Sequence, residues 1–300
     1  MTDHGDVCVL IPTLNEAETI GDVIDRFRAE GFENILVMDG DSEDGTREIA
    51  AEHGATVERQ TGTGKGQAVR QALGQIETSY VLLVDGDGTY RPEDAQKLLE
   101  PLYAGRAEHV IGNRFAEMAT DAMSRLNQVG NRLINAAFRR IHGRDFKDIL
   151  SGYRAFTLES IERFRFTAQG FGIETELAVE CVKNDITTEI VPIRYESRPG
   201  DSETNLRPFR DGGVILLTLY RLAKTSNPLF YFGAFGVIFG GIGTAVGLFV
   251  VIEWFTQSQS HELLAIIAVF AVLFGVQLLI FGVLSDMILA LHREQLRWFD

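Results

Sequence analysis

Lysine and cysteine are scarce in this sequence of 300 residues, and cationic side chains are well outnumbered by anionic ones. Lysine and arginine together number 28 against 42 aspartates and glutamates, so the formal net charge is −14. Such a charge argues against nucleic acid as a partner. The two cysteines, Cys8 and Cys181, fit reduced thiols in a cytoplasmic domain.

Only five of the basic residues are lysines. A surface that is acidic, poor in lysine and still supplied with arginine is favoured in a cytosol at molar salt, because screening there removes the cost of self-repulsion. We therefore expect a halophilic origin. The alternative is a merely acidic protein from an ordinary cytosol.

An N-terminal signal peptide is also lacking. Val7–Ile11 is a short apolar run, and Pro12 and polar residues follow it at once. We therefore expect the N-terminal domain to stay in the compartment where it is synthesised.

Two long segments in the last quarter of the chain lack charge almost completely. Leu229–Ile252 contains no charged residue, and Leu263–Leu291 contains only Asp286. Each exceeds the roughly 20 residues that a helix needs to cross a bilayer, and core helices of soluble proteins rarely run so long without a polar stripe. We therefore predict two transmembrane helices. The first carries glycines whose spacing permits close helix packing, namely Gly236, Gly240, Gly243 and Gly247. We expect them to join the two helices to one another, and the alternative is dimerisation.

Basic residues at the ends of this pair predict its topology. Arg221 and Lys224 precede the first helix, Arg293 and Arg297 follow the second, and the loop Glu253–Glu262 contains neither lysine nor arginine. The positive-inside rule then places both termini in the cytoplasm and the loop outside. The expected organisation is a cytoplasmic α/β domain over 1–202, a juxtamembrane amphipathic segment over 203–228, membrane helices at 229–252 and 263–291, and a cytoplasmic tail over 293–300.

The N-terminal part of the chain alternates short β-rich runs with helical patterns. This alternation predicts a mostly parallel, doubly wound sheet, and ligands of such sheets bind beyond the carboxyl ends of the strands. Two further amphipathic helices are expected at Ser124–Ile141 and Leu206–Ala223. Strands are expected at Val7–Ile11, Asn34–Met38, Thr56–Glu58 and Tyr80–Val84, and helices at Glu16–Glu30, Asp44–His53 and Gly66–Ile76.

The segment after the strand Tyr80–Val84 carries the most specific signal. The apolar strand delivers Asp85 and Asp87, one residue apart, beyond the edge of the sheet. Both carboxylates can reach one hard divalent cation, whose open positions suit a pyrophosphate. Such a cation would neutralise charge on a departing nucleotide diphosphate. The alternative is an acidic turn, since Asp-Gly pairs are common turn formers.

Two further loops strengthen this interpretation. Asp39 ends the second strand, where a carboxylate can accept hydrogen bonds from a ribose hydroxyl or a nucleobase N–H. Capping of the next helix by Ser42 or Asp44 is compatible with that role. Thr61–Gly66 is a glycine-rich turn that opens a helix, so backbone N–H groups and Lys65 could hold phosphate there. It is not a Walker sequence, because no serine or threonine follows the lysine.

Several segments resemble family-two glycosyltransferases of the GT-A (Rossmann-like) fold, in which they occur in the same order. With the two C-terminal helices, the chain is similar to dolichyl-phosphate hexosyltransferases, that is, dolichol-phosphate mannose and glucose synthases. The acidic composition suggests the haloarchaeal enzymes of N-glycosylation. The segments are Ile11–Glu16, the stretch at Asp39, Gly64–Gly66, Asp85–Asp87, Gly112–Arg114 and Asp148–Arg154.

The resemblance implies a set of site residues. Some positions depart from the family pattern: Gly40 stands where many relatives have a second aspartate, Thr89 where a glutamine often assists the metal, and Glu203 where a lysine is frequent. The implied residues are Asp87, Arg114, Arg125 and Arg198 for catalysis and the acceptor phosphate, Pro12, Leu14, Glu16, Asp39, Lys65, Asp85, Ser151 and Ser202 for the nucleotide sugar, and Asp85, Asp87 and Thr89 for Mg²⁺ or Mn²⁺.

The resemblance also implies the reaction, an inverting transfer of a hexose from a nucleotide sugar to dolichyl or polyprenyl phosphate in the membrane, with UDP-glucose favoured. A phosphate acceptor is already an anion at neutral pH and needs no general base, so catalysis would be positioning and charge stabilisation. Three alternatives remain open. They are a GDP-mannose-dependent enzyme, an enzyme acting on a lipid-linked glycan hydroxyl with Asp148 as the candidate base, and a catalytically silent nucleotide-sugar-binding scaffold.

Overall fold

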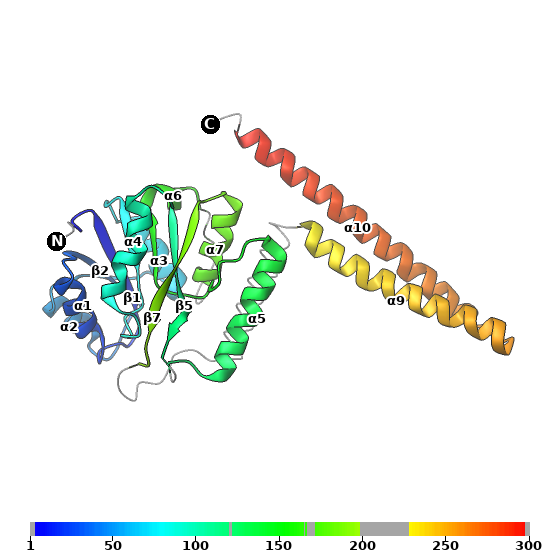
Figure 1. Ribbon diagram of the computed structural model, residues 1–300, viewed down its shortest axis with the longest axis horizontal. Coiled ribbons are helices and arrows are strands. Elements are labelled where there is room, and N and C mark those ends of the chain that lie inside the picture. The colour runs from blue at the N-terminus through cyan, green and yellow to red at the C-terminus, as the bar shows by residue number, and fades with distance from the viewer. Residues whose placement is uncertain (1–3, 120–121, 165, 167–171, 199–227, 298–300) are drawn as a thin grey trace. The chain divides into compact units, whose positions relative to one another are not determined.

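The computed structural model of the protein describes residues 4–119, 122–164, 166, 172–198 and 228–297. The chain divides into two compact units, Met1–Leu219 and Tyr220–Asp300. The first is an α/β domain and the second is a pair of long helices (Figure 1). The predicted amphipathic segment Leu206–Ala223 lies outside the described residues, as does the boundary predicted after residue 202.

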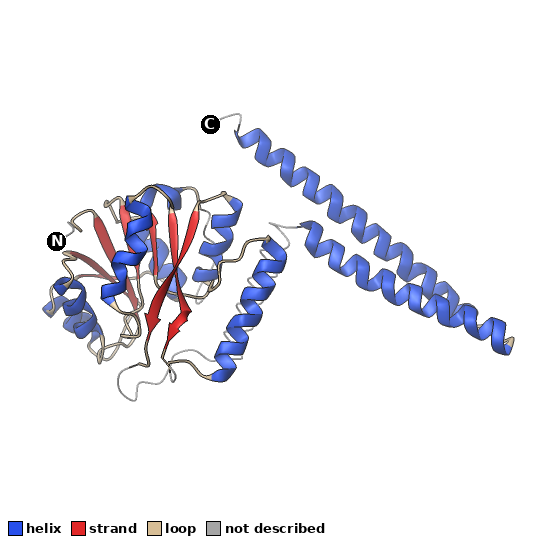
Figure 2. Ribbon diagram, viewed as in Figure 1, coloured by secondary structure: helices blue, strands red, loops and turns tan. Residues whose placement is uncertain are grey.

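Seven strands form one mixed sheet in the order β3-β2-β1-β4-β6-β5-β7. All neighbours pair in parallel except β6, which runs antiparallel to both β4 and β5. Helices lie on both sides of the sheet (Figure 2), so the predicted mostly parallel, doubly wound fold is confirmed. The strands are β1 (Val7–Thr13), β2 (Asn34–Asp39), β3 (Thr56–Arg59), β4 (Tyr80–Leu83), β5 (His109–Met118), β6 (Arg154–Thr157) and β7 (Thr188–Tyr195).

The helices of the first unit connect these strands. Each predicted helix that falls in the described residues is present, with ends shifted by a few residues. The helices are α1 (Ile20–Ala29), α2 (Thr46–Glu52), α3 (Lys65–Leu73), the 3₁₀ turn η1 (Pro92–Asp94), α4 (Ala95–Tyr103), α5 (Arg125–His142), α6 (Leu158–Glu162) and α7 (Ile173–Lys183).

The local sequence explains the core and one shifted boundary. Strand β1 is buried along nearly its whole length, because both faces of the sheet are covered, and its sequence is accordingly a continuous apolar run. Helix α1 begins at Ile20 rather than at the predicted Glu16. Glu16 and Ala17 instead lie in a turn, where their backbone N–H groups donate to the side chains of Thr46 and Asp44.

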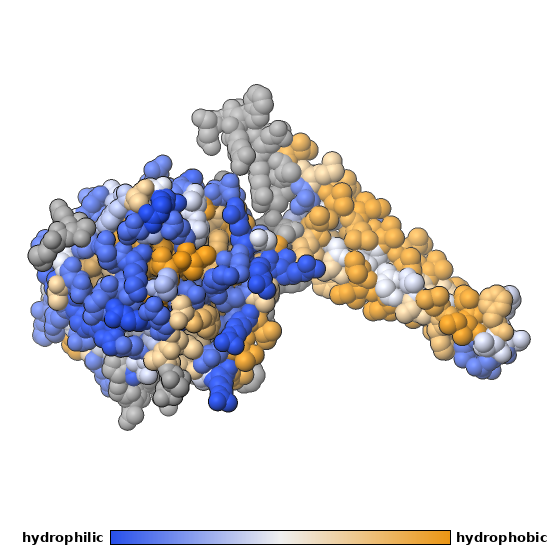
Figure 3. Space-filling model, in the orientation of Figure 1, coloured by the Kyte–Doolittle hydropathy of each residue, from blue (hydrophilic) through white to orange (hydrophobic). Residues whose placement is uncertain are grey.

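The second unit consists of α9 (Pro228–Gln257) and α10 (Glu262–Arg297). Among the described residues, these two helices are long and apolar enough to cross a membrane, and their surface is largely apolar (Figure 3). They pack along one another through glycine, as predicted: a Cβ at Gly236 would lie 2.8 Å from a backbone oxygen of α10, and one at Gly243 would be equally close. Gly240 abuts Gly275, whereas Gly247 is less tightly packed.

Candidate active site

Three loops meet at one edge of the sheet, because β2, β1 and β4 are neighbours. Thr13 at the end of β1 pairs with Asp39 at the end of β2, and Asp85 follows the end of β4. Parallel strands bring their carboxyl ends to the same edge of a sheet. The structure therefore brings together the three loops that the sequence singled out.

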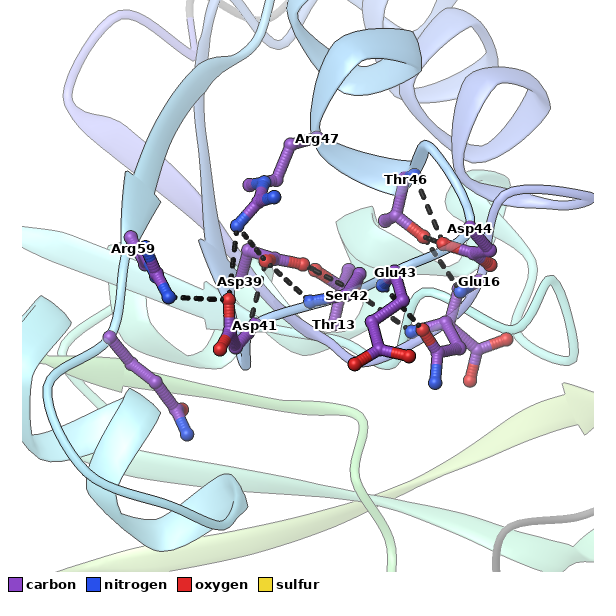
Figure 4. Close-up of polar contacts among 12 residues, drawn as sticks. Thr13, Glu16, Asp39, Asp41, Ser42, Glu43, Asp44, Thr46, Arg47 and Arg59 are labelled. Carbon is purple, nitrogen blue, oxygen red and sulfur yellow. Dashed lines mark hydrogen bonds and ion pairs between the residues drawn. The ribbon is translucent and has the colours of Figure 1, made fainter.

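The loops after β1 and β2 are joined by hydrogen bonds between side chains and backbone (Figure 4). The Asn15 N–H donates to the Ser42 hydroxyl at 2.9 Å, and the Glu43 N–H donates to the Asn15 side chain at 3.0 Å. Glu16 N–H donates to the Thr46 hydroxyl at 2.9 Å. Asn15 has a φ of 55°, a left-handed conformation that asparagine tolerates better than most residues. The two loops form one structure.

Asp39 lies at the centre of this structure and is fully buried. Its carboxylate accepts hydrogen bonds from the N–H groups of Asp41 and Ser42, and from the hydroxyls of Ser42 and Thr13. A buried carboxylate is stable when its oxygens are bonded in this way. These contacts assign Asp39 a role in shaping the loop, and its contact with a nucleoside stays a prediction.

The predicted capping of α2 by Ser42 or Asp44 holds in part, because the Asp44 carboxylate accepts a hydrogen bond of 3.1 Å from the N–H of Thr46, the first residue of α2. The N-cap is Gly45, which has a φ of 94° and no side-chain cap hydrogen bond. The other oxygen of Asp44 accepts from the N–H of Ala17, and the Ser42 hydroxyl accepts from the N–H of Asn15, both in the loop after β1. The hydroxyl and carboxylate that suit an N-cap are therefore used to join two loops.

Lys65 lies between two carboxylates. Its ammonium contacts Asp85, which follows β4, and bonds Glu174 in the first turn of α7 at 2.5 Å. Burial by itself lowers the pKa of Lys65, but the two carboxylates outweigh it and raise the pKa above its ordinary value. Lys65 is thus a fixed cation beside Asp85.

Arg198 joins a second pair of carboxylates. Its guanidinium lies 3.0 Å from Asp87 and 3.4 Å from Glu16. The pKa of Glu16 is raised to about 7: burial is the main cause, the charges of Asp87 and Asp85 add to it, and Arg198 opposes it. The other oxygen of Asp87 accepts from the Thr89 hydroxyl at 2.6 Å. Thr89, predicted as a metal ligand, therefore holds Asp87 in place.

Carboxylates outnumber cations two to one across these two clusters, with Asp85, Glu174, Asp87 and Glu16 against Lys65 and Arg198. The charges of Asp87, Asp85 and Asp44 add to burial in raising the pKa of Glu16. Among the described residues, no group of three or more metal-binding side chains converges on one point.

Arg114 forms a separate buried ion pair. Its guanidinium donates to both oxygens of Asp148, at 2.7 and 2.8 Å, and lies over the ring of Tyr195 at 5.3 Å from the centroid. Burial opposes the charge of Arg114, but Asp148 raises its pKa well above the ordinary value. Asp148 is fully buried, and both of its oxygens accept hydrogen bonds from this arginine.

The other predicted site residues are dispersed. Leu14 is exposed beside the joined loops, and Pro12 is half-buried at the end of β1. Ser151 is fully buried, with its hydroxyl near the Tyr153 N–H. Arg125 is exposed at the start of α5 and joins neither cluster in the part of the chain that the structure describes. Ser202 lies outside the described residues.

Sequence reasoning missed Glu174 and Tyr90. Glu174 is buried with Glu176 and Glu180 in an otherwise apolar stretch of α7, and acidic residues at buried helical positions were a usable signal. Tyr90 is buried, packs against Tyr195 at 5.3 Å, and accepts a hydrogen bond from the Gly152 N–H. Tyr90 therefore packs against the same ring over which the Arg114 guanidinium lies.

Known proteins share both the sequence and the fold. Residues 8–164 match the family model described as Glycosyl transferase family 2. The chain is 59% identical to Glycosyltransferase AglJ of Haloferax volcanii over 97% of its own length and 96% of that protein. It is 33% identical to the Dolichyl-phosphate hexose transferase of the same organism, over 72% of this chain and 93% of the relative. Both relatives are haloarchaeal, in agreement with the expected halophilic origin.

Solved structures show the same fold. Glucosyl-3-phosphoglycerate synthase from Mycobacterium tuberculosis, in complex with Mn²⁺, UDP and glucosyl-3-phosphoglycerate, matches with a TM-score of 0.59 and 23% identity, over 72% of this chain and 79% of that one. A likeness at this identity establishes the GT-A fold of the first unit and no more. Taken with the family match and the two haloarchaeal relatives, it leads to one conclusion: the chain belongs to glycosyltransferase family 2, as an enzyme related to dolichyl-phosphate hexosyltransferases.

Proposed function

We propose that the protein transfers a hexose, with glucose from UDP-glucose favoured, to dolichyl or polyprenyl phosphate with inversion at the anomeric carbon. The observation that carries this proposal is the anionic cluster around Asp85 and Asp87 at the carboxyl edge of the sheet. The relationship to a dolichyl-phosphate hexose transferase supports a lipid phosphate as the acceptor. The lipid-linked hexose would then serve protein N-glycosylation.

Asp85 and Asp87 would hold the divalent cation, Mg²⁺ or Mn²⁺. Carboxylate oxygens suit hard cations, and such ions are often bound through one or two carboxylates together with substrate phosphates. The excess of carboxylates in the clusters fits a doubly charged ion. When bound, the ion supplies charge neutralisation for the leaving diphosphate.

The other side chains of the site would act by positioning the donor and the acceptor. Lys65 and Arg198 each bind two carboxylates, and both lie where they could also pair with the donor phosphates. The acceptor phosphate oxygen forms a bond to the anomeric carbon as the bond from that carbon to the donor phosphate breaks. The nucleoside diphosphate then leaves with the electron pair.

The geometry of Asp148 favours a phosphate acceptor over a sugar hydroxyl. A hydroxyl needs a general base within reach of its proton, and Asp148 was the candidate. Its two oxygens are bonded to Arg114 inside the core, which does not suit a base. Arg125 and Arg198 would instead bind the acceptor phosphate, because arginine pairs with phosphate through two parallel hydrogen bonds. Arg114, whose Nε and Nη2 are held by Asp148, would add a further donor to that phosphate.

Two finer points rest on the sequence, the first on the resemblance and the second on apolar length and the positions of basic residues. UDP-glucose is favoured over GDP-mannose, which stays the second candidate donor. The helices α9 and α10 would anchor the enzyme in the cell membrane, with the catalytic unit (Met1–Leu219) and both termini cytoplasmic. Anchoring would keep the active site near a lipid acceptor and raise its effective concentration.

Transfer of radiolabelled hexose into extractable lipid tests the proposal. Membranes carrying the wild type would receive labelled UDP-glucose or GDP-mannose, polyprenyl phosphate, and Mg²⁺ or Mn²⁺ at high salt. We expect metal-dependent label from UDP-glucose in a lipid labile to mild acid, absent with Asp87→Asn and retained with Asp22→Asn, a change at an exposed carboxylate of α1. Label from GDP-mannose alone would reassign the donor. No lipid label from either donor would contradict the proposal.

A further inference from the structure

Three different groups converge on Gly40, the residue that follows β2. A Cβ at Gly40 would lie 3.1 Å from the backbone oxygen of Thr13. It would also lie 3.5 Å from Leu14 Cδ1 and 3.6 Å from Gln60 Nε2. Because glycine has no side chain, a flat ligand can approach the backbone here between a carbonyl, an apolar side chain and an amide. We call these four residues the Gly40 surface.

Gln60 is the member of this surface with an unsatisfied polar atom. It directly follows β3 and is only 7% exposed. Its Nε2 donates to the Gly62 carbonyl at 3.1 Å, which fixes the orientation of the amide. Its Oε1 accepts no hydrogen bond from the part of the chain that the structure describes, and it is not closed off from solvent. Nearly buried carbonyl oxygens are usually paired, so this one indicates a ligand that donates a hydrogen bond.

Two charged residues near the Gly40 surface are bonded elsewhere. Asp39 is 0% exposed, and its carboxylate accepts hydrogen bonds from its own loop. Arg59, the last residue of β3, pairs with Asp41 at 2.7 Å (Figure 4). A ligand on the Gly40 surface would therefore meet the Gln60 amide rather than either of these charges.

We propose that Gln60 recognises the edge of the donor nucleobase, which would lie on the Gly40 surface against Leu14. The proposal rests on the proposed function, because it takes the donor to be a nucleotide sugar. Uracil and guanine each present a ring N–H beside a carbonyl oxygen. The ring N–H would donate to Gln60 Oε1, and the second hydrogen of Nε2 would donate to the base carbonyl, since Gly62 uses only the first. Leu14 is 46% exposed and would pack on the face of the base.

The strand order allows one donor to reach both this surface and the carboxylate clusters. Gly40 follows β2 and Asp85 follows the end of β4, with β1 between the two strands. Two strand spacings are about 10 Å, a gap that a ribose and its phosphates can span. A nucleotide with its base on the Gly40 surface would lie across the end of β1 and bring its diphosphate to Asp85 and Lys65.

The hydrogen bond from Gln60 to Gly62 allows a different role, which is to hold the glycine-rich turn Thr61–Gly66 in place. Gly62 has a φ of 91°, so this turn depends on a conformation that few residues adopt. Support of the turn would affect every nucleotide alike, because it involves no contact with the edge of the base. A probe that changes one atom of the base therefore separates the two roles.

Binding of UDP and of N3-methyl-UDP, which lacks the ring N–H, tests the proposal. The full chain in nanodiscs, at high salt with Mg²⁺, would be titrated calorimetrically as the wild type and as Gln60→Ala. We expect the wild type to bind N3-methyl-UDP at least about tenfold more weakly than UDP, because a hydrogen bond is lost. Gln60→Ala should bind both nucleotides with affinities within about twofold of each other. If the wild type binds GDP and not UDP, GDP and N1-methyl-GDP take their place.

Each other result overturns the proposal in a recognisable way. If the wild type binds both nucleotides alike, the ring N–H is not recognised. If Gln60→Ala weakens both by the same factor, Gln60 only supports the turn. In either case the proposed function stands, because the nucleotide is still bound. If the wild type binds neither UDP nor GDP, the proposed donor site fails as a whole.

A second variant tests selectivity between bases. Gln60→Glu replaces the donating Nε2 with an oxygen, so the side chain suits the two adjacent N–H donors of guanine and opposes the carbonyl oxygens of uracil. We expect the ratio of the affinity for UDP to that for GDP to fall by at least about tenfold. Gln75→Glu adds the same charge at an exposed position after α3 and should leave the ratio unchanged. An unchanged ratio in Gln60→Glu would overturn the proposal, since damage to the turn weakens both nucleotides equally.

Discussion

Replacing Asp148 with leucine should destabilise the protein strongly, because it leaves Arg114 charged and buried without its partner. The two side chains share hydrogen bonds of 2.7 and 2.8 Å, and Asp148 is fully buried. Removing one member of a buried ion pair costs about 3–5 kcal/mol. At roughly 2–4 °C per kcal/mol for a domain of this size, Tm should fall by about 6–20 °C.

Thermal unfolding of the full chain in nanodiscs would compare the wild type with Asp148→Leu, Arg114→Leu and the double variant. We expect the double variant to lose at least about 2 kcal/mol less than the two single changes together, because apolar side chains can replace a buried pair. Asp185→Asn is the control, since its ion pair with Arg144 is exposed and should contribute about 1 kcal/mol or less. Additive losses, or a Tm change no larger than that of the control, would refute the reasoning.

The same residue separates the two candidate acceptors. Asp148→Asn keeps the shape of the side chain and one acceptor oxygen but removes the charge that fixes Arg114. We expect a raised KM for the lipid phosphate and an unchanged dependence of kcat on pH. A general base would behave differently, because its loss removes an ionisation from the pH–rate profile. If Asp148→Asn removes an ionisation from the dependence of kcat on pH, the acceptor is a sugar hydroxyl rather than a phosphate.

Three further changes give distinct outcomes. Burial lowers the pKa of His109 well below its usual value, so on acidification the unfolded chain takes up a proton that the folded chain does not. The free energy of unfolding should therefore be greatest above about pH 6.5 and fall as the pH drops below that value. His109→Leu should make this fall smaller in thermal unfolding measured across that pH range. Gly275→Leu should destabilise the helix pair by about 1–3 kcal/mol, because its Cβ would lie 2.7 Å from two backbone atoms of α9. Gly241→Leu should not, because a Cβ there has no neighbour within 4 Å. Equal Tm values for the two variants would contradict this reasoning. Glu174→Gln removes one negative charge beside Lys65, so half-maximal activity should need about tenfold more Mg²⁺ or Mn²⁺, and an unchanged metal titration would count against the charge argument.

Local sequence patterns predicted the parts of the fold that depend on local physics. The apolar run of β1 and the periodic face of α1 predicted buried elements, and the ends of β1, β2 and β4 predicted the loops of the site. The antiparallel β6 was not predicted. It has only four residues, and pairing direction depends on partners elsewhere in the chain rather than on the strand itself.

The partners of the charged residues could not be predicted. The sequence indicated Lys65, Asp85 and Arg114 as chemically suited to phosphate or metal, but their contacts lie far away along the chain. Glu174 is 109 residues from Lys65, and Asp148 is 34 residues from Arg114. Such pairs depend on the packing of α7 and of the segment before β6, for which local periodicity contains no information.

The hydrogen bonds that join the loops after β1 and β2 also bear on the entropy of substrate binding. Asn15, Glu16 and Glu43 have their N–H groups fixed by side chains of the opposite loop. Ordering a free loop around a ligand opposes association, and here that ordering takes place when the protein folds. A donor bound as we propose would therefore meet a preformed surface. The three amides should be protected from hydrogen exchange in the free enzyme, and protected together, because loss of one contact frees both loops.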